Sequence, residues 1–217
     1  MAFGSSVRVW GDFACFTRPE MKVERVSYEV ITPSAARGVL EAIYWKPQIR
    51  WVVDKIQVIK PIRFLNLRRN ELGSKFSADA AKSVAKLGAG TLGMFIEEER
   101  QQRAALILRD VEYHIHAHID LSDESEPIGK HLDTFRRRVE RGQCFHRPYL
   151  GCREFPAEFG PLSEPTLSHP DLKGSRSLGY MLWDIDFQND MRAHFFDAKM
   201  VDGTIIVPPF ASEELVS

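Results

Sequence analysis

The sequence predicts a mixed α+β fold. Residues 111–121 alternate apolar and polar side chains, which is typical of a strand with one buried face. Two other stretches, 33–46 and 128–141, place apolar residues at the spacing of a helix buried on one side. Beyond residue 156, extended segments follow one another with turn-forming residues between them. We therefore expect a unit of strands and helices followed by a smaller antiparallel β-sheet.

The extended segments of the first unit are rich in branched and aromatic residues. They are residues 7–16, 26–31, 51–59, 62–67 and 104–121. The first helix begins at Thr32, which can cap free N–H groups, and at Pro33, which suits the first helical position. Pro47 ends this helix, and Gly142 ends the second.

The order of the first 155 residues is roughly strand, helix, strand, strand, helix, strand, which resembles that of a ferredoxin-like (RRM-like) domain. We predict such a domain over residues 1–155 and an appended C-terminal antiparallel β-sheet domain over residues 156–217. Residues 70–93 contain many small residues, among them Gly88, Gly90 and Gly93, with little periodicity. This stretch predicts a loop insertion near 70–100, of the kind that orders when a ligand binds.

Composition places the chain among ordinary globular proteins. Its 217 residues can bury a core, and hydrophobic and charged residues make up 44% and 27%. There is no apolar run near the ~20 residues that span a bilayer, and the N-terminus lacks the apolar segment of a signal peptide. Cys15, Cys144 and Cys152 lack the pair spacing of a zinc site, so we interpret them as reduced thiols. We expect a cytoplasmic protein that does not contact a membrane.

The polar face of the 111–121 strand carries an unusual row of side chains. They are Glu112, His114, His116, His118 and Asp120. Neighbours on one face of a strand lie about 7 Å apart, so the row forms a continuous surface. Imidazoles serve as general acids, general bases, metal ligands or nucleic-acid contacts. The residues alone leave three hypotheses: an acid/base site, a metal site, or a solvated surface.

Positive charge is segregated, although the net charge is only −1. Residues 37–69 carry eight Lys or Arg against two acidic residues, and residues 130–153 carry seven against two. Acidic residues concentrate instead at 97–99 and 120–126. This distribution can present a positive groove to phosphates, although solvated helix and strand faces would give the same count.

Two short motifs add candidate residues. The Tyr-Trp-Lys-Pro motif at 44–47 closes the first helix, where Trp45 could stack on a base and Lys46 could hold a phosphate. Tyr44 itself falls on the apolar stripe of the helix, as a core aromatic residue would. In the motif Pro148–Phe155, a glycine permits close backbone approach and Arg153 could contact a phosphate.

Together these segments resemble the Cas-five family of CRISPR-associated proteins, in its type I-C (Dvulg subtype) form. This family is a RAMP-type subunit of the CRISPR surveillance complex. The resemblance extends over nearly the whole chain and is carried by four segments. They are Trp10–Thr17, Thr32–Pro47, Leu108–His118 and Pro148–Phe155. It implies a ferredoxin-like RAMP domain with a C-terminal β-sheet domain.

The resemblance also implies an endoribonuclease that cleaves CRISPR repeat RNA at the base of its hairpin, without a metal or other cofactor. Attack by the 2′-hydroxyl would leave a 2′,3′-cyclic phosphate and a 5′-hydroxyl. The protein would then stay on the 5′ handle of the crRNA, with the other subunits of the type I-C Cascade complex. The tyrosine of the family's catalytic group falls on Tyr44 and its histidine on His118, whereas its lysine position is His116 here.

Basic side chains are expected to position the RNA backbone. They are Lys46, Arg37, Arg136, Arg137, Arg138, Arg141 and Arg153. A lysine stays charged at neutral pH, whereas a histidine titrates near ~6.5. If His116 has to be protonated while His118 is neutral, the cleavage rate should peak between two pKa values near neutrality.

Two other functions remain as alternatives. A non-catalytic subunit that caps crRNA and bridges to neighbouring Cascade subunits would use the same surface, and loss of the lysine favours it. A metal-dependent enzyme acting on DNA or a small molecule would depend on the three histidines alone. Family members also act on duplex DNA with a divalent metal, so the resemblance allows duplex DNA as a further partner.

Overall fold

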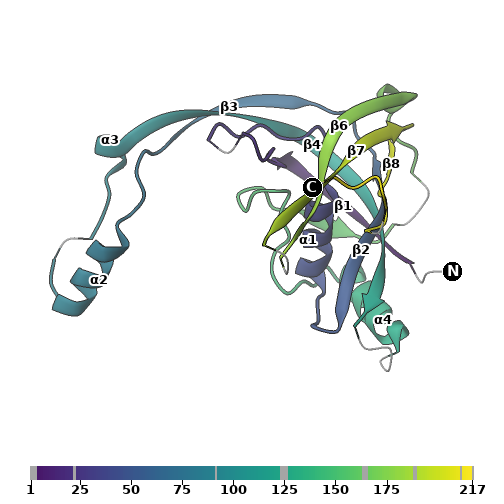
Figure 1. Cartoon of the computed structure of the whole chain (residues 1–217), viewed down its shortest axis with the longest axis horizontal. Coiled ribbons are helices and arrows are strands. Elements are labelled where there is room, and N and C mark those ends of the chain that lie inside the picture. The colour runs from purple at the N-terminus through teal and green to yellow at the C-terminus, as the bar shows by residue number, and fades with distance from the viewer. Residues whose placement is uncertain are drawn as a thin grey trace.

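The computed structural model confirms a mixed fold, built on a curled antiparallel sheet with few helices (Figure 1). It describes residues 4–21, 23–90, 92–122, 127–162, 166–187, 190–210 and 212–216. The strands are β1 (Gly4–Ala14), β2 (Ile49–Val58), β3 (Phe64–Leu72), β4 (Arg100–Leu121), β5 (Glu158–Gly160), β6 (Ser175–Asp186), β7 (Arg192–Val201) and β8 (Thr204–Ile206). The helices are α1 (Pro33–Ile43), α2 (Ala78–Leu87), α3 (Ile96–Glu99) and α4 (Ile128–Glu140), with a 3₁₀ turn at Pro170–Leu172.

Strand β4 lies at the centre of the sheet and pairs with β1, β2 and β3. Its alternating pattern has the predicted effect, because Tyr113, Ile115 and Ala117 are buried in the core. Helices α1 and α4 cover this side of the sheet, where the ring of Trp51 on β2 lies 4.6 Å from that of Phe135 on α4. We call this side the helix face. The other side, which carries His114, His116 and His118, is the histidine face.

The first helix forms as the sequence predicts but ends earlier. Thr32 accepts a hydrogen bond from the N–H of Ala35, and Pro33 occupies the first turn. The backbone becomes extended at Tyr44, three residues before Pro47. Residues 26–31 do not form the expected strand, since they contribute only isolated bridges such as Thr17 to Ser27.

The C-terminal strands extend the same sheet. The strand order is β5-β1-β4-β2-β8-β7-β6, and β8 joins through the pairing of Lys55 with Ile206. Two contacts from the Arg37 guanidinium on α1 to Asp184 on β6, at 2.7 and 2.9 Å, also tie the two parts together. The division at residue 155 stays a prediction, and β5 lies beyond it while pairing with β1.

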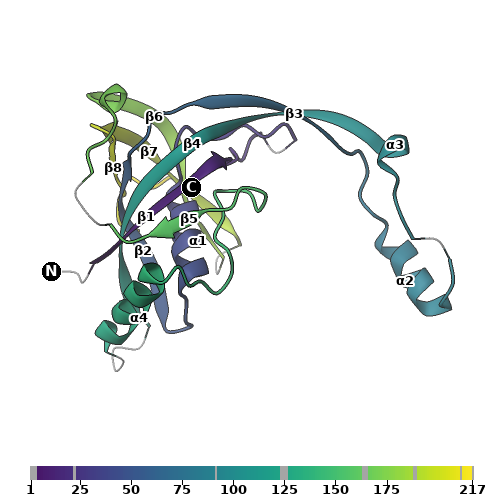
Figure 2. The same ribbon diagram turned by 180° about the vertical axis from the view of Figure 1, so that it is seen from behind.

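Strands β3 and the first half of β4 form a long two-stranded arm that reaches away from the body (Figures 1 and 2). The expected insertion near 70–100 lies at the far end of this arm and is more ordered than the sequence predicts. Ser77 caps α2 through its side chain, and Gly88 ends the helix with φ of 66°. The glycines and small residues of this stretch favoured a loop in the sequence, and none of the residues of α2 is buried. No described helix is long and apolar enough to cross a membrane.

Candidate active site

The histidine face holds two hydrogen-bonded imidazoles. The pairing of β1 with β4 places Ser6 opposite His116, and the serine Oγ lies 2.7 Å from Nδ1 of this histidine. Nδ1 of His118 lies 2.7 Å from Oδ1 of Asp54, and its Nε2 lies 3.4 Å from Oδ1 of Asp120. A bulge between Val53 and Lys55 in β2 brings the Asp54 carboxylate to this position. His118 is therefore held between two carboxylates.

Burial keeps His114 and His116, two of the three imidazoles on this face, uncharged. His114 is 2% exposed, and its ring nitrogens lack a hydrogen-bond partner. Burial lowers the pKa of His114 even though Glu112 lies nearby. The pKa of His116 falls to about 4 because of burial, with further lowering by Lys55 and by His114. His116 is thus neutral at neutral pH in the free protein, contrary to the expectation that it replaces a charged lysine there.

A second pair of side chains lies on the helix face. Tyr44 follows α1, and its carbonyl accepts a hydrogen bond of 2.8 Å from the indole N–H of Trp51. The Tyr44 hydroxyl lies 2.9 Å from Nδ1 of His131, in the first turn of α4. The guanidinium of Arg138 lies 5.1 Å from the centre of the Tyr44 ring and donates to the carbonyl of Ile43 at 2.6 Å. The tyrosine is therefore fixed from both ends.

The structure does not bring the three expected catalytic residues together. Tyr44 packs on the helix face, whereas His116 and His118 point from the opposite face of the sheet. The Tyr44 hydroxyl instead lies next to His131, a residue that the sequence did not single out. A signal was present, since His131 follows Ile128 by three residues and precedes Phe135 by four, which places a histidine on the apolar stripe of a helix.

The expected RNA contacts are distributed unevenly. Lys46, Arg137 and Arg141 are exposed on the elements that carry Tyr44 and His131. Arg136 is also exposed but faces the start of β1, where it lines a hollow of about 300 Å³ with Ser5 and Pro161. Two others differ: Arg153 is exposed on the loop before β5, and Arg37 is engaged with Asp184 and with Glu41.

The residues that the structure describes include no group of three or more His, Cys, Asp or Glu side chains arranged to hold a metal ion. On the histidine face, two imidazoles use a ring nitrogen for Ser6 and for Asp54 instead of converging on one point. The chemistry that these sites offer through their own side chains is proton transfer by imidazole, together with positive charge from Lys and Arg.

Residues 6–208 match the family model described as CRISPR-associated protein (Cas_Cas5). A CRISPR pre-crRNA endoribonuclease Cas5d from Mannheimia succiniciproducens is 51% identical over 225 residues, which covers 99% of both chains. The protein of the same name from Thermus thermophilus is 46% identical over 185 residues, covering 85% of this chain and 74% of that one. A crystal structure of a CRISPR-associated protein has a TM-score of 0.70 at 23% identity over both full chains, so it shares the fold.

Proposed function

The chain belongs to the CRISPR-associated Cas5 family, and we propose that it is an endoribonuclease that processes CRISPR precursor RNA, as the names of its Cas5d relatives state for them. The substrate is the repeat RNA, cleaved at the base of its hairpin. The cleavage uses the ribose 2′-hydroxyl as the nucleophile and requires no metal. Its products carry a 2′,3′-cyclic phosphate and a 5′-hydroxyl.

The contact between Tyr44 and His131 carries the mechanistic part of this proposal. Attack of a 2′-oxygen on the adjacent phosphate needs a base, an acid and positive charge for the developing anion. An imidazole performs either proton transfer near neutral pH. The 2.9 Å contact with the Tyr44 hydroxyl fixes the orientation of the His131 ring. When this hydroxyl donates, the proton of the neutral ring lies on Nε2, which then exchanges protons with the RNA.

Lysine side chains next to this pair supply positive charge. Lys46 lies two residues after Tyr44 and Lys130 precedes His131, and both lysines are exposed. An ammonium group supplies the positive charge that the neutral His116 lacks. We assign contacts with the RNA backbone near the pair to Lys46, Arg137 and Arg141. Arg136 and Arg153 are assigned further contacts with the RNA backbone. The part assigned to Arg138 is to hold Tyr44.

Access to the pair requires movement. Tyr44 is 4% exposed and His131 is 2% exposed in the free protein. Trp45, between Tyr44 and Lys46, is an exposed aromatic residue that can stack on an RNA base. Binding of RNA to this turn would therefore shift the residues that cover the pair. Catalytic contacts that are incomplete in a free enzyme commonly tighten when the substrate binds.

The histidine face is the second candidate for the catalytic group, with His118 as base or acid and His116 as its complement. Its support is access, because the His118 side chain is 24% exposed and hydrogen-bonded to Asp54. A third possibility is that the protein binds crRNA without cleaving it. Replacement of His131 and of His118, each alone, separates these three proposals.

Partners and placement follow from the same premise. We propose that the protein stays on the 5′ handle of the crRNA, joins the other subunits of a type I-C Cascade complex and works in the cytoplasm. Its N-terminal part is proposed to be ferredoxin-like. The antiparallel order β5-β1-β4-β2, with α1 after β1 and α4 after β4, supports that assignment. Metal-dependent action on duplex DNA is a separate hypothesis.

Incubation of the full chain with repeat RNA in EDTA tests the proposed function. We expect one cut, with a 2′,3′-cyclic phosphate on the upstream product, which resists a phosphatase until acid opens the ring. A deoxyribose at the nucleotide before the cut should abolish cleavage and leave binding intact. Cleavage that appears only after a divalent metal is added, or that tolerates the deoxyribose, contradicts the mechanism.

A further inference from the structure

Two cysteines that are far apart in the sequence meet beside the root of the arm. Cys15 follows β1, and its N–H donates to the carbonyl of Leu150 at 3.0 Å. Sγ of Cys152 lies 3.5 Å from the carbonyl oxygen of Cys15. Gly151 has φ of +83°, and a Cβ there would lie 2.1 Å from the same oxygen. The loop thus presses against Cys15 as closely as a backbone without a side chain allows.

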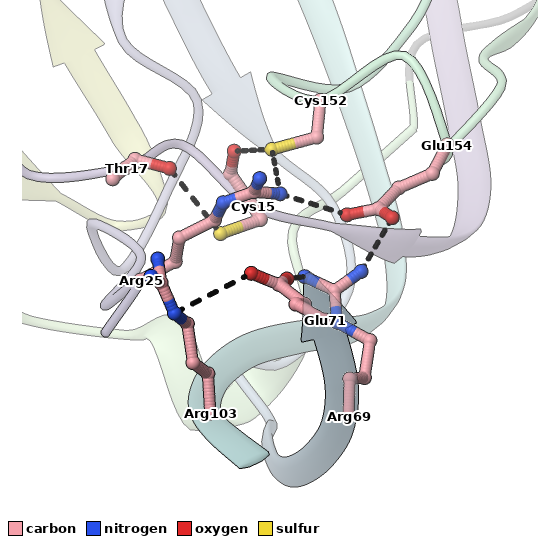
Figure 3. A network of polar contacts seen from close by, with 8 residues as sticks. All are labelled: Cys15, Thr17, Arg25, Arg69, Glu71, Arg103, Cys152 and Glu154. Atoms are coloured by element: carbon pink, nitrogen blue, oxygen red, sulfur yellow. Dashed lines mark hydrogen bonds and ion pairs between the residues drawn. The ribbon is translucent and has the colours of Figure 1, made fainter. Parts of the chain in front are cut away.

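A network of charged groups surrounds this contact (Figure 3). Nη1 of Arg25 lies 3.8 Å from Sγ of Cys152 and 3.1 Å from Oε1 of Glu154. Glu154 also pairs with Arg69 on β3, at the root of the arm. The Arg25 guanidinium is therefore shared between a carboxylate and a sulfur atom. Proximity to a guanidinium stabilises the thiolate form of a cysteine.

The two thiols are unequal. A hydrogen bond from the Cys15 thiol lowers the pKa of Cys152 to about 6, with help from Arg25 and against the effect of burial. The same contact and burial raise the pKa of Cys15. Cys15 is 1% exposed, whereas solvent reaches part of Cys152. One thiolate that a small oxidant can reach thus lies against one buried thiol.

We propose that Cys152 and Cys15 form a peroxide-responsive thiol pair, in which Cys152 is the thiol that reacts and Cys15 the one that resolves it. The Cys152 thiolate attacks hydrogen peroxide, forms an S–O bond and releases hydroxide, which leaves a sulfenic acid. The Cys15 thiol then attacks this sulfur, and the hydroxyl leaves as water. Two thiols are oxidised to one disulfide, and one peroxide is reduced to two waters.

The disulfide would link the end of β1 to the loop that carries Glu154. Arg25 contacts both the Cys152 sulfur and Glu154, and Glu154 also pairs with Arg69. Oxidation of Cys152 would remove the negative charge of the thiolate from this network. The pair plays no part in the proposed RNA cleavage, since Tyr44 and His131 do not contact it. Its failure and the failure of the proposed function are therefore independent.

Reaction with hydrogen peroxide at pH 6 gives the sharpest test. At this pH about half of the Cys152 side chains are thiolates, whereas only roughly 0.3% of a thiol with pKa ~8.5 is ionised. A thiolate of lower basicity is also less nucleophilic, with a Brønsted slope of about 0.4–0.5, which offsets part of this gain. We expect Cys152 to be oxidised about tenfold faster than free N-acetylcysteine in the same buffer.

The product is identified by alkylating the remaining thiols of the full chain and digesting it with chymotrypsin. This protease cuts after Phe145 and Tyr149 and so separates Cys144 from Cys152. We expect a peptide that links Cys15 to Cys152, a dithiothreitol-reversible loss of two hydrogens from the intact mass, and the same result in Cys144→Ser. Cys15→Ala should accumulate a dimedone-reactive sulfenic acid at Cys152.

Three results overturn the proposal. The first is oxidation of Cys152 in the wild-type protein no faster than the reference thiol. The second is a disulfide that contains Cys144, and the third is direct passage of Cys152 to sulfinic acid without a link to Cys15. All three are measured on the wild-type chain, so none depends on whether a variant at the buried Cys15 folds.

Discussion

The two faces of the sheet around β4 hold their histidines in opposite ways. On the histidine face, burial removes charge: it lowers the pKa of His114 and brings that of His116 to about 4. On the helix face, Nδ1 of His131 lies 2.9 Å from the hydroxyl of Tyr44, and the exposed Lys46 and Lys130 lie close to the two residues in the sequence. The contrast teaches that a row of histidines on one strand does not by itself bring an imidazole next to Tyr44.

The two faces also differ in the elements that form their contacts. The histidine face is formed by neighbouring strands, so its contacts follow from register, as Ser6 opposite His116 illustrates. The pair on the helix face joins the end of α1 to the start of α4, which are 87 residues apart. Packing of two helices on one sheet creates this contact, and a strand pattern cannot reveal it.

Replacing the histidine of the helix face should have the largest effect. We expect His131→Ala to slow single-turnover cleavage by about 10³-fold, since a general acid or base contributes roughly 10²–10⁴-fold. The matched change on the other face, His118→Ala, should alter the rate less than about threefold. Quenched-flow cleavage of saturating repeat RNA measures both rates.

The opposite ranking would assign the chemistry to the histidine face. Circular dichroism and melting temperature should accompany these rates, because His131 is buried and its loss leaves a small cavity. If both variants cleave at the wild-type rate while RNA binding persists, neither face carries the proton transfer.

Removal of the tyrosine hydroxyl should have the next largest effect. Tyr44→Phe keeps the ring beneath Arg138 and deletes only the group that orients His131. We expect a loss of about 10- to 100-fold in the rate of cleavage, because the imidazole loses its fixed orientation. RNA affinity should stay within about twofold, as measured by filter binding. A loss of affinity with an unchanged rate would instead make Tyr44 a binding residue.

How far the sequence predicts this molecule depends on the range of the interactions. Thr32 and Pro33 mark the start of α1 because capping is local, and alternation in β4 identifies its buried face because a strand has a fixed period. Helix α2 lies among glycines and small residues, which favour a loop, and none of its residues is buried. The candidate catalytic group is the hardest part to predict: the sequence singles out Tyr44, but the contact of Tyr44 with His131 depends on tertiary packing.

The low pKa of His116 predicts a cost in stability at acidic pH. Its pKa is about 4 when folded and ~6.5 when unfolded, so the unfolded chain binds more protons between these values. The contribution of the neutral His116 to the free energy of unfolding is therefore fully present above pH ~6.5 and is lost as the pH drops towards 4. We expect His116→Gln, which can still hydrogen-bond to Ser6, to lose on the order of 2 kcal/mol less over this range than the wild type.

Urea unfolding at several pH values between 4 and 7 measures this difference. The variant should show a shallower dependence of the unfolding free energy on pH, by up to one proton. Equal slopes for the two proteins would mean that His116 titrates normally in the folded state. Its availability as a charged group near neutral pH, and with it the catalytic hypothesis for the histidine face, would then regain support.

The smallest effects should come from single lysines, and they test which face the RNA follows. Lys46 lies next to Trp45 on the exposed turn after α1, whereas Lys55 pairs with the position of His116 on β4. We expect Lys46→Ala to weaken RNA binding about three- to fivefold and to reduce the slope of log K against log salt by about one. Lys55→Ala should leave both unchanged and should raise the pKa of His116, because Lys55 lowers it.

Since each variant removes one ammonium group, their net charges are equal, and a difference in salt slope reports the position of the phosphates. A loss of slope in Lys55→Ala alone would place the RNA backbone across the histidine face, where His118 would be the nearest exposed imidazole.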